Sequence, residues 1–239
     1  MKAMILAAGL GTRLSPLTDN IPKALVEING TTLLERTIKK LSGAGFNEII
    51  INVHHFSGKI TDYLVRNKNF GAHIEISDES SVLLDTGGGI KKAAYFFTGR
   101  EPFIVHNVDV ISSINLNDLL NNHISSGALA TLAVMTRKAD RYLLFSHENK
   151  LCGWTNVTKN ESKWSVPGIT NVSYFAFSGI HVLNPEIFPL IKENGVFSVI
   201  DLYLRLSASF PIKAYVHYTS FYLDLGKPEN INIAASEGY

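Results

Sequence analysis

Short apolar runs alternate with segments of helical periodicity along the first half of the chain. The apolar runs at residues 3–8, 48–53, 73–77, 103–107 and 129–135 are predicted to be buried strands. Helices are expected at residues 32–44, 59–66, 89–97 and 116–124, where apolar residues recur every three or four positions. This alternation predicts an α/β fold, with a parallel or mixed sheet that is covered by helices on both faces.

The pattern changes in the second half. Residues 142–164 contain both tryptophans of the chain and show little periodicity, which predicts a hairpin or an irregular insert. Strands are expected at residues 174–183 and 212–218, and helices at residues 185–192, 198–206 and 228–237. No proline-rich or serine-rich linker divides the chain, so we expect one domain over residues 1–239.

The composition narrows the class of protein. With 46% hydrophobic and 18% charged residues, it is typical of a compact soluble protein. The formal net charge is +1 and no run of lysine and arginine stands out, so we expect no binding to nucleic acid or to an anionic membrane. No segment approaches the roughly 20 apolar residues that a membrane helix needs. Cys152 is the only cysteine, which favours a reducing compartment and a cytoplasmic location.

The most informative local feature is a glycine-rich turn directly after the first predicted strand. Residues 6–18 are LAAGLGTRLSPLT, and PKAL follows at 22–25. Small residues let the backbone turn so that its amides can point at phosphate oxygens. Arg13 offers a planar fork for a polyphosphate, and Lys23 a compact second cation. The turn lacks the third glycine of a dinucleotide fingerprint and the Gly-Lys-Ser/Thr of a P-loop. A plain tight turn with two surface cations is the structural alternative.

A second candidate is the sequence DTGGGI at residues 85–90. Three successive glycines at the start of a helical segment let the backbone come close to a flat ligand. The amides at the helix N-terminus would also favour an anion. The alternative is a flexible loop with a glycine N-cap.

Two aspartates are candidate metal ligands. Asp109 follows the apolar strand 103–107, and ligands gather at the carboxyl ends of strands in open α/β sheets. Asp224 lies far along the chain, before a turn and a helix. Because Mg²⁺ binds through one or two carboxylates plus substrate phosphates, both aspartates suit it. Each of them alone is also compatible with a cap on a turn.

Taken together and in order, these segments resemble the signature of the sugar-phosphate nucleotidyltransferases. The likeness covers nearly the whole chain, from the glycine-rich turn through Asp109 and residues 177–180 to residues 224–229. It implies a Rossmann-like fold with a central mixed, mostly parallel sheet flanked by helices. It also implies that a sugar 1-phosphate attacks the α-phosphorus of a nucleoside triphosphate, with Mg²⁺ as cofactor and pyrophosphate as the leaving group. Positioning and charge neutralisation supply most of such catalysis, so no covalent intermediate is expected.

The resemblance also implies roles for individual residues. Arg13 would bind the departing pyrophosphate, and Lys23 the α-phosphate or the sugar phosphate. Asp109 and Asp224 would hold Mg²⁺, and Ser178 would lie on the sugar side. The remaining residues would bind the nucleotide: Ala7, Ala8, Gly9, Gly11, Thr12, Asp85, Gly87, Gly88 and Asn107.

Some positions depart from the pattern of the family. Ala24 replaces a common proline, Asp85 replaces a glutamate, and Lys227 replaces a threonine. Val108 stands where a glycine usually precedes the first metal aspartate. Its β-branched side chain would either crowd the ribose or metal, or point into the core.

Within the family, the likeness is greatest to N-acetylmuramic acid 1-phosphate uridylyltransferases, then to mannose 1-phosphate guanylyltransferases and phosphocholine cytidylyltransferases. The last would need several aromatic faces around a quaternary ammonium, for which Trp154, Trp164 and Tyr174 are candidates. Against a dinucleotide-dependent oxidoreductase, this chain lacks the third glycine of the dinucleotide fingerprint. A catalytically silent nucleotide sensor is opposed by the joint presence of the two cations and two aspartates. The base, the sugar and the oligomeric state stay open.

Overall fold

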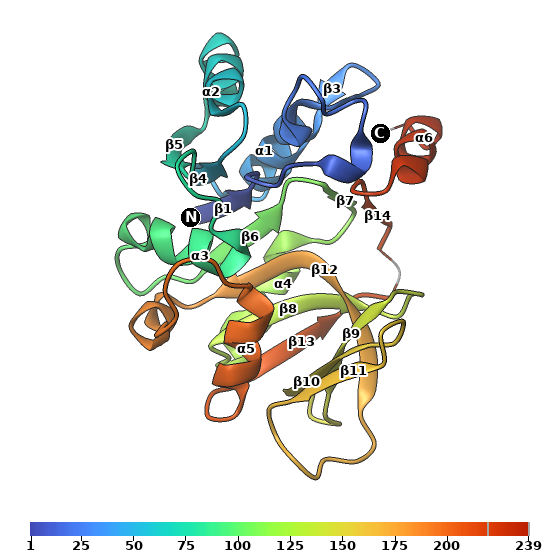
Figure 1. Cartoon of the computed structure of the whole chain (residues 1–239). Helices are drawn as coiled ribbons and strands as arrows, with labels where there is room; N and C mark the ends of the chain where they lie inside the picture. Colours follow the sequence, from blue (N-terminus) through green and yellow to red (C-terminus); the bar gives the residue numbers. More distant parts are fainter. Residues whose placement is uncertain (219, 239) are drawn as a thin grey trace.

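A ten-stranded mixed sheet forms the centre of the computed structural model, which describes residues 1–218 and 220–238 (Figure 1). Its parallel part has the order β5–β4–β1–β6. These strands are β1 (Lys2–Leu6), β4 (Glu48–Val53), β5 (His73–Asp78) and β6 (Phe103–Asn107). The sequence predicts all of them. Because they run in the same direction, their carboxyl ends meet at one edge of the sheet, where ligands gather in open α/β folds.

Helices cover both faces of the sheet, as predicted. Within β1, Ala3 and Ile5 belong to one hydrophobic cluster and Met4 to the other, because successive side chains of a strand point to opposite faces. The first cluster includes residues of α1 (Leu33–Gly43), α2 (Ser57–Arg66), α4 (Leu116–Ser126) and α6 (Pro228–Ser236); the second includes residues of α3 (Asp85–Lys92) and α5 (Val199–Ser207). No helix of the described residues is long and apolar enough to cross a membrane.

The long strand β12 (Ser173–Leu183) joins the two halves of the sheet. Its C-terminal part pairs antiparallel with β6 and its N-terminal part with β9. The other strands of the second half are β8 (Ala130–Met135), β9 (Arg141–Phe145), β10 (Leu151–Asn156), β11 (Glu161–Trp164) and β13 (Ile212–Val216). Strands β9, β10 and β11 form an antiparallel meander. The hairpin interpretation of residues 142–164 is therefore confirmed, and the irregular insert is wrong.

Several short elements differ from the prediction. The sequence does not predict the pairs β2 (Glu27–Ile28) with β3 (Thr31–Thr32), or β7 (Val110–Ser112) with β14 (Tyr222–Asp224). Residues 185–192 contain the 3₁₀ segment η5 (Pro185–Leu190) instead of an α-helix. Pro189 lies inside this segment and has no amide hydrogen for an α-helical hydrogen bond. The remaining 3₁₀ segments are η1 (Thr12–Leu14), η2 (Lys23–Leu25), η3 (Lys68–Gly71) and η4 (Ala93–Phe96).

Candidate active site

The glycine-rich turn follows β1 and is tightly packed at Gly11. This residue has φ +70°, and a Cβ built on it would lie 3.1 Å from both Lys23 Cβ and Thr18 Cγ2. Its carbonyl oxygen accepts hydrogen bonds from the Leu14 amide (2.8 Å) and the Thr18 hydroxyl (2.9 Å). At Gly9, by contrast, a Cβ would meet no atom within 4 Å. The turn is therefore held firmly behind Gly11 and borders open space at Gly9.

A buried carboxylate supports the start of this turn. The Ala7 amide donates to Asn52 Oδ1 (2.7 Å), and Asn52 Nδ2 donates to Glu79 Oε1 (2.8 Å). Glu79 Oε2 accepts the amide of Leu84 (3.0 Å), directly before α3, and the Glu79 side chain is fully buried. These hydrogen bonds connect the turn to the helix that begins at Asp85. Neither Asn52 nor Glu79 is predicted from the sequence, although an asparagine near the end of the apolar strand 48–53 is a usable signal.

Glu79→Gln is expected to lower the free energy of unfolding by about 1–3 kcal/mol. Both carboxylate oxygens accept hydrogen bonds, so a glutamine would turn its NH₂ group toward one of the two donors and leave that donor unpaired. Urea denaturation followed by circular dichroism measures the change. The exposed Glu101→Gln is the matched control, expected to stay within about 0.5 kcal/mol of the parent. Equal values for the two variants would contradict the supporting role of Glu79.

The glycines of α3 are required by packing. A Cβ on Gly87 would collide with the ring of Phe197, and one on Gly88 would lie 2.5 Å from the carbonyl oxygen of Gly195. A Cβ on Gly89 would lie 2.7 Å from Glu79 Oε1. All three glycines are buried inside the helix, so the flexible-loop alternative is wrong.

Two residues at the start of this segment, Asp85 and Thr86, line a cavity. Asp85 has φ +58°, and its Oδ1 accepts a hydrogen bond from the Thr86 amide (2.6 Å). Gly87 and Gly88 are not part of that cavity's wall, and their contacts are with residues 195–197. A role for these two glycines in nucleotide binding stays a prediction.

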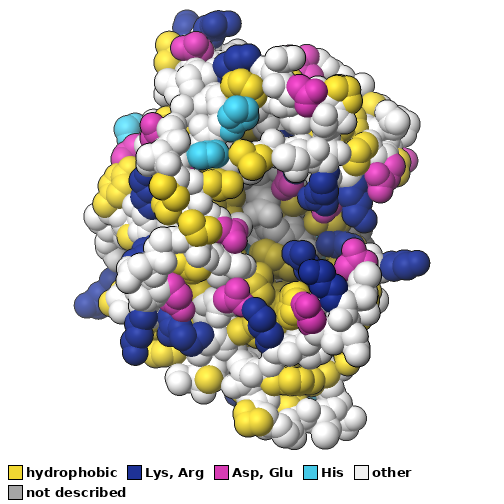
Figure 2. All heavy atoms as spheres, in the orientation of Figure 1, with side chains coloured by type: hydrophobic (Ala, Val, Ile, Leu, Met, Phe, Trp, Pro, Cys, Tyr) yellow, Lys and Arg dark blue, Asp and Glu magenta, His cyan; other side chains and the backbone are white. Residues whose placement is uncertain are grey.

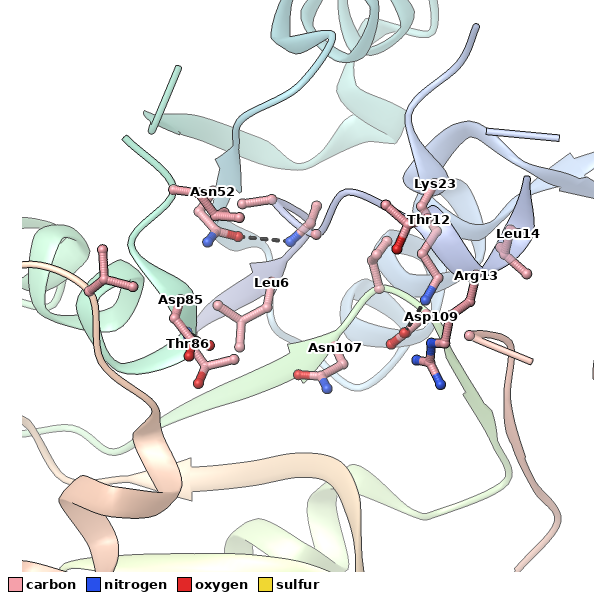
Figure 3. A pocket seen from close by; sticks show the side chains of 18 residues that line it. Leu6, Thr12, Arg13, Leu14, Lys23, Asn52, Asp85, Thr86, Asn107 and Asp109 are labelled. Atoms are coloured by element: carbon pink, nitrogen blue, oxygen red, sulfur yellow. Dashed lines mark hydrogen bonds and ion pairs between the residues drawn. The ribbon is translucent and has the colours of Figure 1, made fainter. Parts of the chain in front are cut away.

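Asp109 lies between β6 and β7, and its carboxylate is paired with the ammonium group of Lys23 (Figure 3). Lys23 is only 8% exposed, so water screens the pair weakly. Asp224 ends β14 and lies opposite Val110, the first residue of β7. The Leu225 amide also donates to the Asp109 carbonyl oxygen (2.8 Å). The β7–β14 pairing thus brings together two aspartates that are far apart in the sequence.

The chemistry of this pair fits Mg²⁺. Among the described residues, Asp109 Oδ2 binds Lys23 and Asp224 Oδ1 accepts the Gly226 amide (2.8 Å), which leaves the other oxygen of each carboxylate without a hydrogen bond. The described part of the chain has no cluster of three or more His, Cys, Asp or Glu that could hold a metal. Two carboxylates suit an ion that completes its coordination with substrate phosphates and water.

Arg13 lies in η1, and its guanidinium group lies against Gly226. A Cβ on Gly226 would collide with Arg13 Nη2 and would lie 2.9 Å from Asp224 Oδ1. Glycine at this position therefore leaves the space that the guanidinium occupies. Within the described residues Arg13 has no hydrogen-bond or ion-pair partner, so its donors are available to a ligand.

Two cavities adjoin at these residues, with volumes of about 490 Å³ and 850 Å³. Both are lined by Leu6, Arg13, Asp85, Thr86, Asn107 and Asp109. In Figure 3, Arg13, Lys23 and Asp109 lie on one side of the first cavity, Asp85 and Thr86 on the other, and Asn107 between them. The second cavity extends along β9–β12 and includes Asp224. Figure 2 shows the hollow, with lysine and arginine side chains gathered on one side.

Most of the predicted site residues are brought together by this arrangement. The first cavity is lined by Ala7, Ala8, Gly9, Gly11, Thr12, Arg13, Lys23, Asp85, Asn107 and Asp109. Val108 is buried in the first hydrophobic cluster, as one of the two alternatives for it predicts, and it also borders this cavity; crowding of a ribose or a metal by Val108 stays a prediction.

Ser178 is not brought to either of these cavities. Its side chain is fully buried, and its hydroxyl is hydrogen-bonded to His217 Nε2 (2.8 Å). Its neighbours Phe177 and Gly179 line the second cavity instead, because alternate residues of a strand point to opposite faces. Direct contact between the Ser178 hydroxyl and a sugar is therefore absent from this geometry.

Of the three aromatic residues considered for a quaternary ammonium, only one lines either of these cavities. Trp154 lines the second cavity, whereas Trp164 and Tyr174 are 48% and 52% exposed and do not belong to its wall. The ammonium group of Lys163 lies over the Trp154 ring, 5.7 Å from its centroid. One face of the single tryptophan in the cavity is thus already covered by a cation.

The fold and the site define an α/β protein with two adjoining cavities beside a pair of aspartates. The chain belongs to the nucleotidyl transferase family, whose sequence model matches residues 2–231. It is 32% identical over 215 residues to the N-acetylmuramate alpha-1-phosphate uridylyltransferase of Caulobacter vibrioides, covering 86% of this chain and 84% of the relative. It is 31% identical over 228 residues to the enzyme of the same name from Neisseria meningitidis serogroup B, covering 95% and 93%.

The fold has close counterparts among solved structures. The crystal structure of HddC from Yersinia pseudotuberculosis complexed with GMP-PN superimposes with a TM-score of 0.78, at 23% identity, over 100% of this chain and 99% of that one. This likeness bears on the fold, and the predicted Rossmann-like nucleotidyltransferase fold is confirmed. Together with the family match, the relatives establish that the protein is a sugar-1-phosphate nucleotidyltransferase, an enzyme of nucleotide-sugar biosynthesis.

Proposed function

We propose that this enzyme transfers uridylate from UTP to N-acetylmuramic acid 1-phosphate in a Mg²⁺-dependent reaction. The main support for the substrates is the identity of 31–32% to two uridylyltransferases of that name. The single observation that supports the chemistry is the meeting of two cavities at Arg13 and Asp109. A nucleotide in the first cavity and an acceptor in the second would have their reacting phosphates at this junction.

The reaction at this junction is a single displacement. An oxygen of the acceptor phosphate forms a bond to the α-phosphorus, and the bond from that phosphorus to the bridging oxygen of the β-phosphate breaks. The electron pair leaves with pyrophosphate. A sugar phosphate is largely ionised at pH 7, since its second pKa is about 6, so no general base is needed. Positioning and charge stabilisation are then the main tasks of the protein.

The side chains divide these tasks by their place in the two cavities. The turn at residues 9–12 and the end of β6 bind the triphosphate and ribose, and Asp85 lies at the side where the base enters. Lys23 contributes its charge beside Asp109, at the α-phosphate. Arg13, whose donors have no partner among the described residues, binds the leaving pyrophosphate. Asp109 and Asp224 would hold Mg²⁺, which neutralises phosphate charge and polarises the α-phosphoryl group.

UTP with N-acetylmuramic acid 1-phosphate is expected to exceed CTP with phosphocholine by at least about a hundredfold in specificity constant, roughly 2.7 kcal/mol of differential transition-state binding. A quaternary ammonium needs several converging aromatic faces. In the second cavity the ammonium group of Lys163 lies over the ring of Trp154, while Trp164 and Tyr174 are exposed and outside the wall of this cavity. The measurement is pyrophosphate release at one Mg²⁺ concentration for each nucleoside triphosphate against phosphocholine and several sugar 1-phosphates, including GTP with mannose 1-phosphate.

The outcomes of this panel separate the candidates. A preference for GTP and mannose 1-phosphate would replace the substrates and keep the chemistry. A preference for phosphocholine that is lost in Trp154→Ala and kept in Trp164→Ala would overturn the sugar assignment. No pyrophosphate release with any pair would leave a nucleotide sensor as the function, and equilibrium binding of UTP would then be the measurement to make.

A further inference from the structure

Arg137 is a half-buried cation in the wall of the second cavity, just beyond the end of β8. Its guanidinium group lies over the ring of Tyr222, with Cζ 4.9 Å from the ring centroid. Its Nη2 donates to the carbonyl oxygen of Phe177 in β12 (3.1 Å). A stacked ring and a hydrogen bond to backbone hold the group in one orientation, so less side-chain entropy is lost when it binds a ligand.

This cation lacks a negative partner in the part of the chain that the structure describes. Its Nε is buried and has no hydrogen-bond partner among the described residues, and no carboxylate of the described part of the chain forms an ion pair with it. The nearby His217 supplies no compensating charge, because a histidine is neutral or positive; burial and then the charge of Arg137 lower its pKa, which favours the neutral ring. A partly desolvated charge without a partner is unfavourable, and an anionic ligand would relieve this cost.

Arg137 is connected through Tyr222 to the strands beside the two aspartates. Tyr222, under the guanidinium, is two residues before Asp224 on β14, and β14 pairs with β7 directly after Asp109. The tyrosine therefore connects the cation to the strand pair that brings the two aspartates together.

The backbone that Arg137 binds is also next to the junction of the cavities. Phe177 precedes Gly179, which has φ +70° where the pairing of β12 is irregular. A Cβ on Gly179 would lie 2.9 Å from Asn107 Nδ2, so β12 and the end of β6 are in close contact here. Arg137 is therefore anchored on the acceptor side of the site.

Other cations of the second cavity are placed differently. Lys163 is paired with Asp201 (2.5 Å) and is mostly exposed. Arg141, Lys159 and Lys227 are exposed at the cavity wall. Arg13 adjoins Gly226 beside the first cavity, where we assign it to pyrophosphate. Arg137 alone among these is half-buried and oriented by a ring and a carbonyl group.

We propose that Arg137 binds the phosphate of the acceptor sugar and positions its attacking oxygen toward the α-phosphorus. The inference rests on the proposed function, and it assigns the residue that selects a sugar carrying a 1-phosphate. A free sugar, or an acceptor without an anion at this place, would leave the guanidinium unpaired and would bind poorly.

The test compares Arg137→Met and Arg137→Lys with the parent and with Arg66→Met, a matched loss of one arginine at the exposed end of α2. In Arg137→Met, the specificity constant for the sugar 1-phosphate is expected to fall at least about 100-fold, the scale of removing one partner from a shielded charged contact. The KM for the nucleotide should change by less than about threefold, because that ligand's contacts are intact. Arg137→Lys should recover only part of the loss, since lysine has no planar fork. Arg66→Met should match the parent.

Equilibrium binding identifies which anion Arg137 recognises. The parent and Arg137→Met are each titrated calorimetrically with N-acetylmuramic acid 1-phosphate and with N-acetylglucosamine 1-phosphate. Both ligands should bind more weakly to Arg137→Met than to the parent. Weaker binding of only the first would assign Arg137 to the carboxylate of the lactyl group and overturn the phosphate proposal. Unphosphorylated N-acetylmuramic acid should bind the parent and the variant alike.

The failure of this inference can be told apart from the failure of the proposed function. An inactive parent would reject the function. An active parent with unchanged acceptor kinetics in Arg137→Met would reject only the role of Arg137, as would equal losses for acceptor and nucleotide. If Arg137→Met does not fold, Arg137→Lys keeps the charge and carries the same comparison of KM values.

Discussion

Asp109→Asn and Asp224→Asn are each expected to reduce the turnover number by at least about a thousandfold, roughly 4 kcal/mol of barrier, while the protein stays folded. The β7–β14 pairing brings the two carboxylates together, and each retains one oxygen without a hydrogen bond to any residue that the structure describes. An asparagine keeps the size of the side chain but replaces a charged oxygen ligand by a neutral amide, which Mg²⁺ binds more weakly. Steady-state rates measured over a range of Mg²⁺ concentrations would show the loss.

The two variants should differ in stability, and this difference separates the metal from other roles. Asp109→Asn also removes the charge that neutralises the shielded Lys23, so its unfolding midpoint should fall. In Asp224→Asn the remaining carbonyl oxygen can still accept the Gly226 amide, so stability should change little. Asp62→Asn, on the exposed face of α2, is the control for a lost surface charge. Activity within about tenfold of the parent in both active-site variants would remove the metal pair from the mechanism.

Local patterns predict the regular elements of this fold well because each pattern reports a local physical preference. The strand of residues 48–53 and the helix of residues 32–44 are found almost at their true ends. The helix is predicted from its apolar stripe, and in the structure Thr32 caps it by accepting the Glu35 amide (3.1 Å). The pair β7–β14 has three residues in each strand and joins a segment in the middle of the chain to one near its C-terminus. No local periodicity marks strands of that length, so their pairing was not predictable from it.

Part of the candidate site could be predicted because certain residue types, in a certain order along the chain, suggest phosphate or metal binding. Arg13, Lys23 and Asp109 are examples. The site was not predictable where the environment decides. Gly87 and Gly88 look like a ligand-binding loop in the sequence, yet Phe197 and Gly195 fill the space beside them. Arg137 is one arginine among many in the sequence, and only the tertiary contacts with Tyr222 and Phe177 distinguish it. The side on which a strand residue such as Ser178 points depends on the register of its pairing.

Arg13→Lys is expected to reduce the turnover number by about a hundredfold while the equilibrium affinity for the nucleotide changes less than about threefold. Lysine keeps the positive charge but loses the fork that can bind two phosphate oxygens at once. If the guanidinium stabilises the departing pyrophosphate, the loss falls mainly on the transition state and much less on the bound nucleotide. Equilibrium binding of UTP without acceptor, and the KM for pyrophosphate in the reverse reaction, measure the two effects separately.

Gly226→Ala provides an independent route to the same position. Its added Cβ would occupy the space of Arg13 Nη2, so the guanidinium must move although residue 13 is unchanged. This variant should therefore show the signature of Arg13→Lys, a lower turnover number and a raised KM for pyrophosphate with nearly unchanged UTP binding. Arg66→Lys is the matched control and should behave as the parent. Equal losses in UTP affinity and turnover for both active-site variants would mean that Arg13 binds the triphosphate equally in the ground state and in the transition state, and its assignment to the leaving group would be wrong.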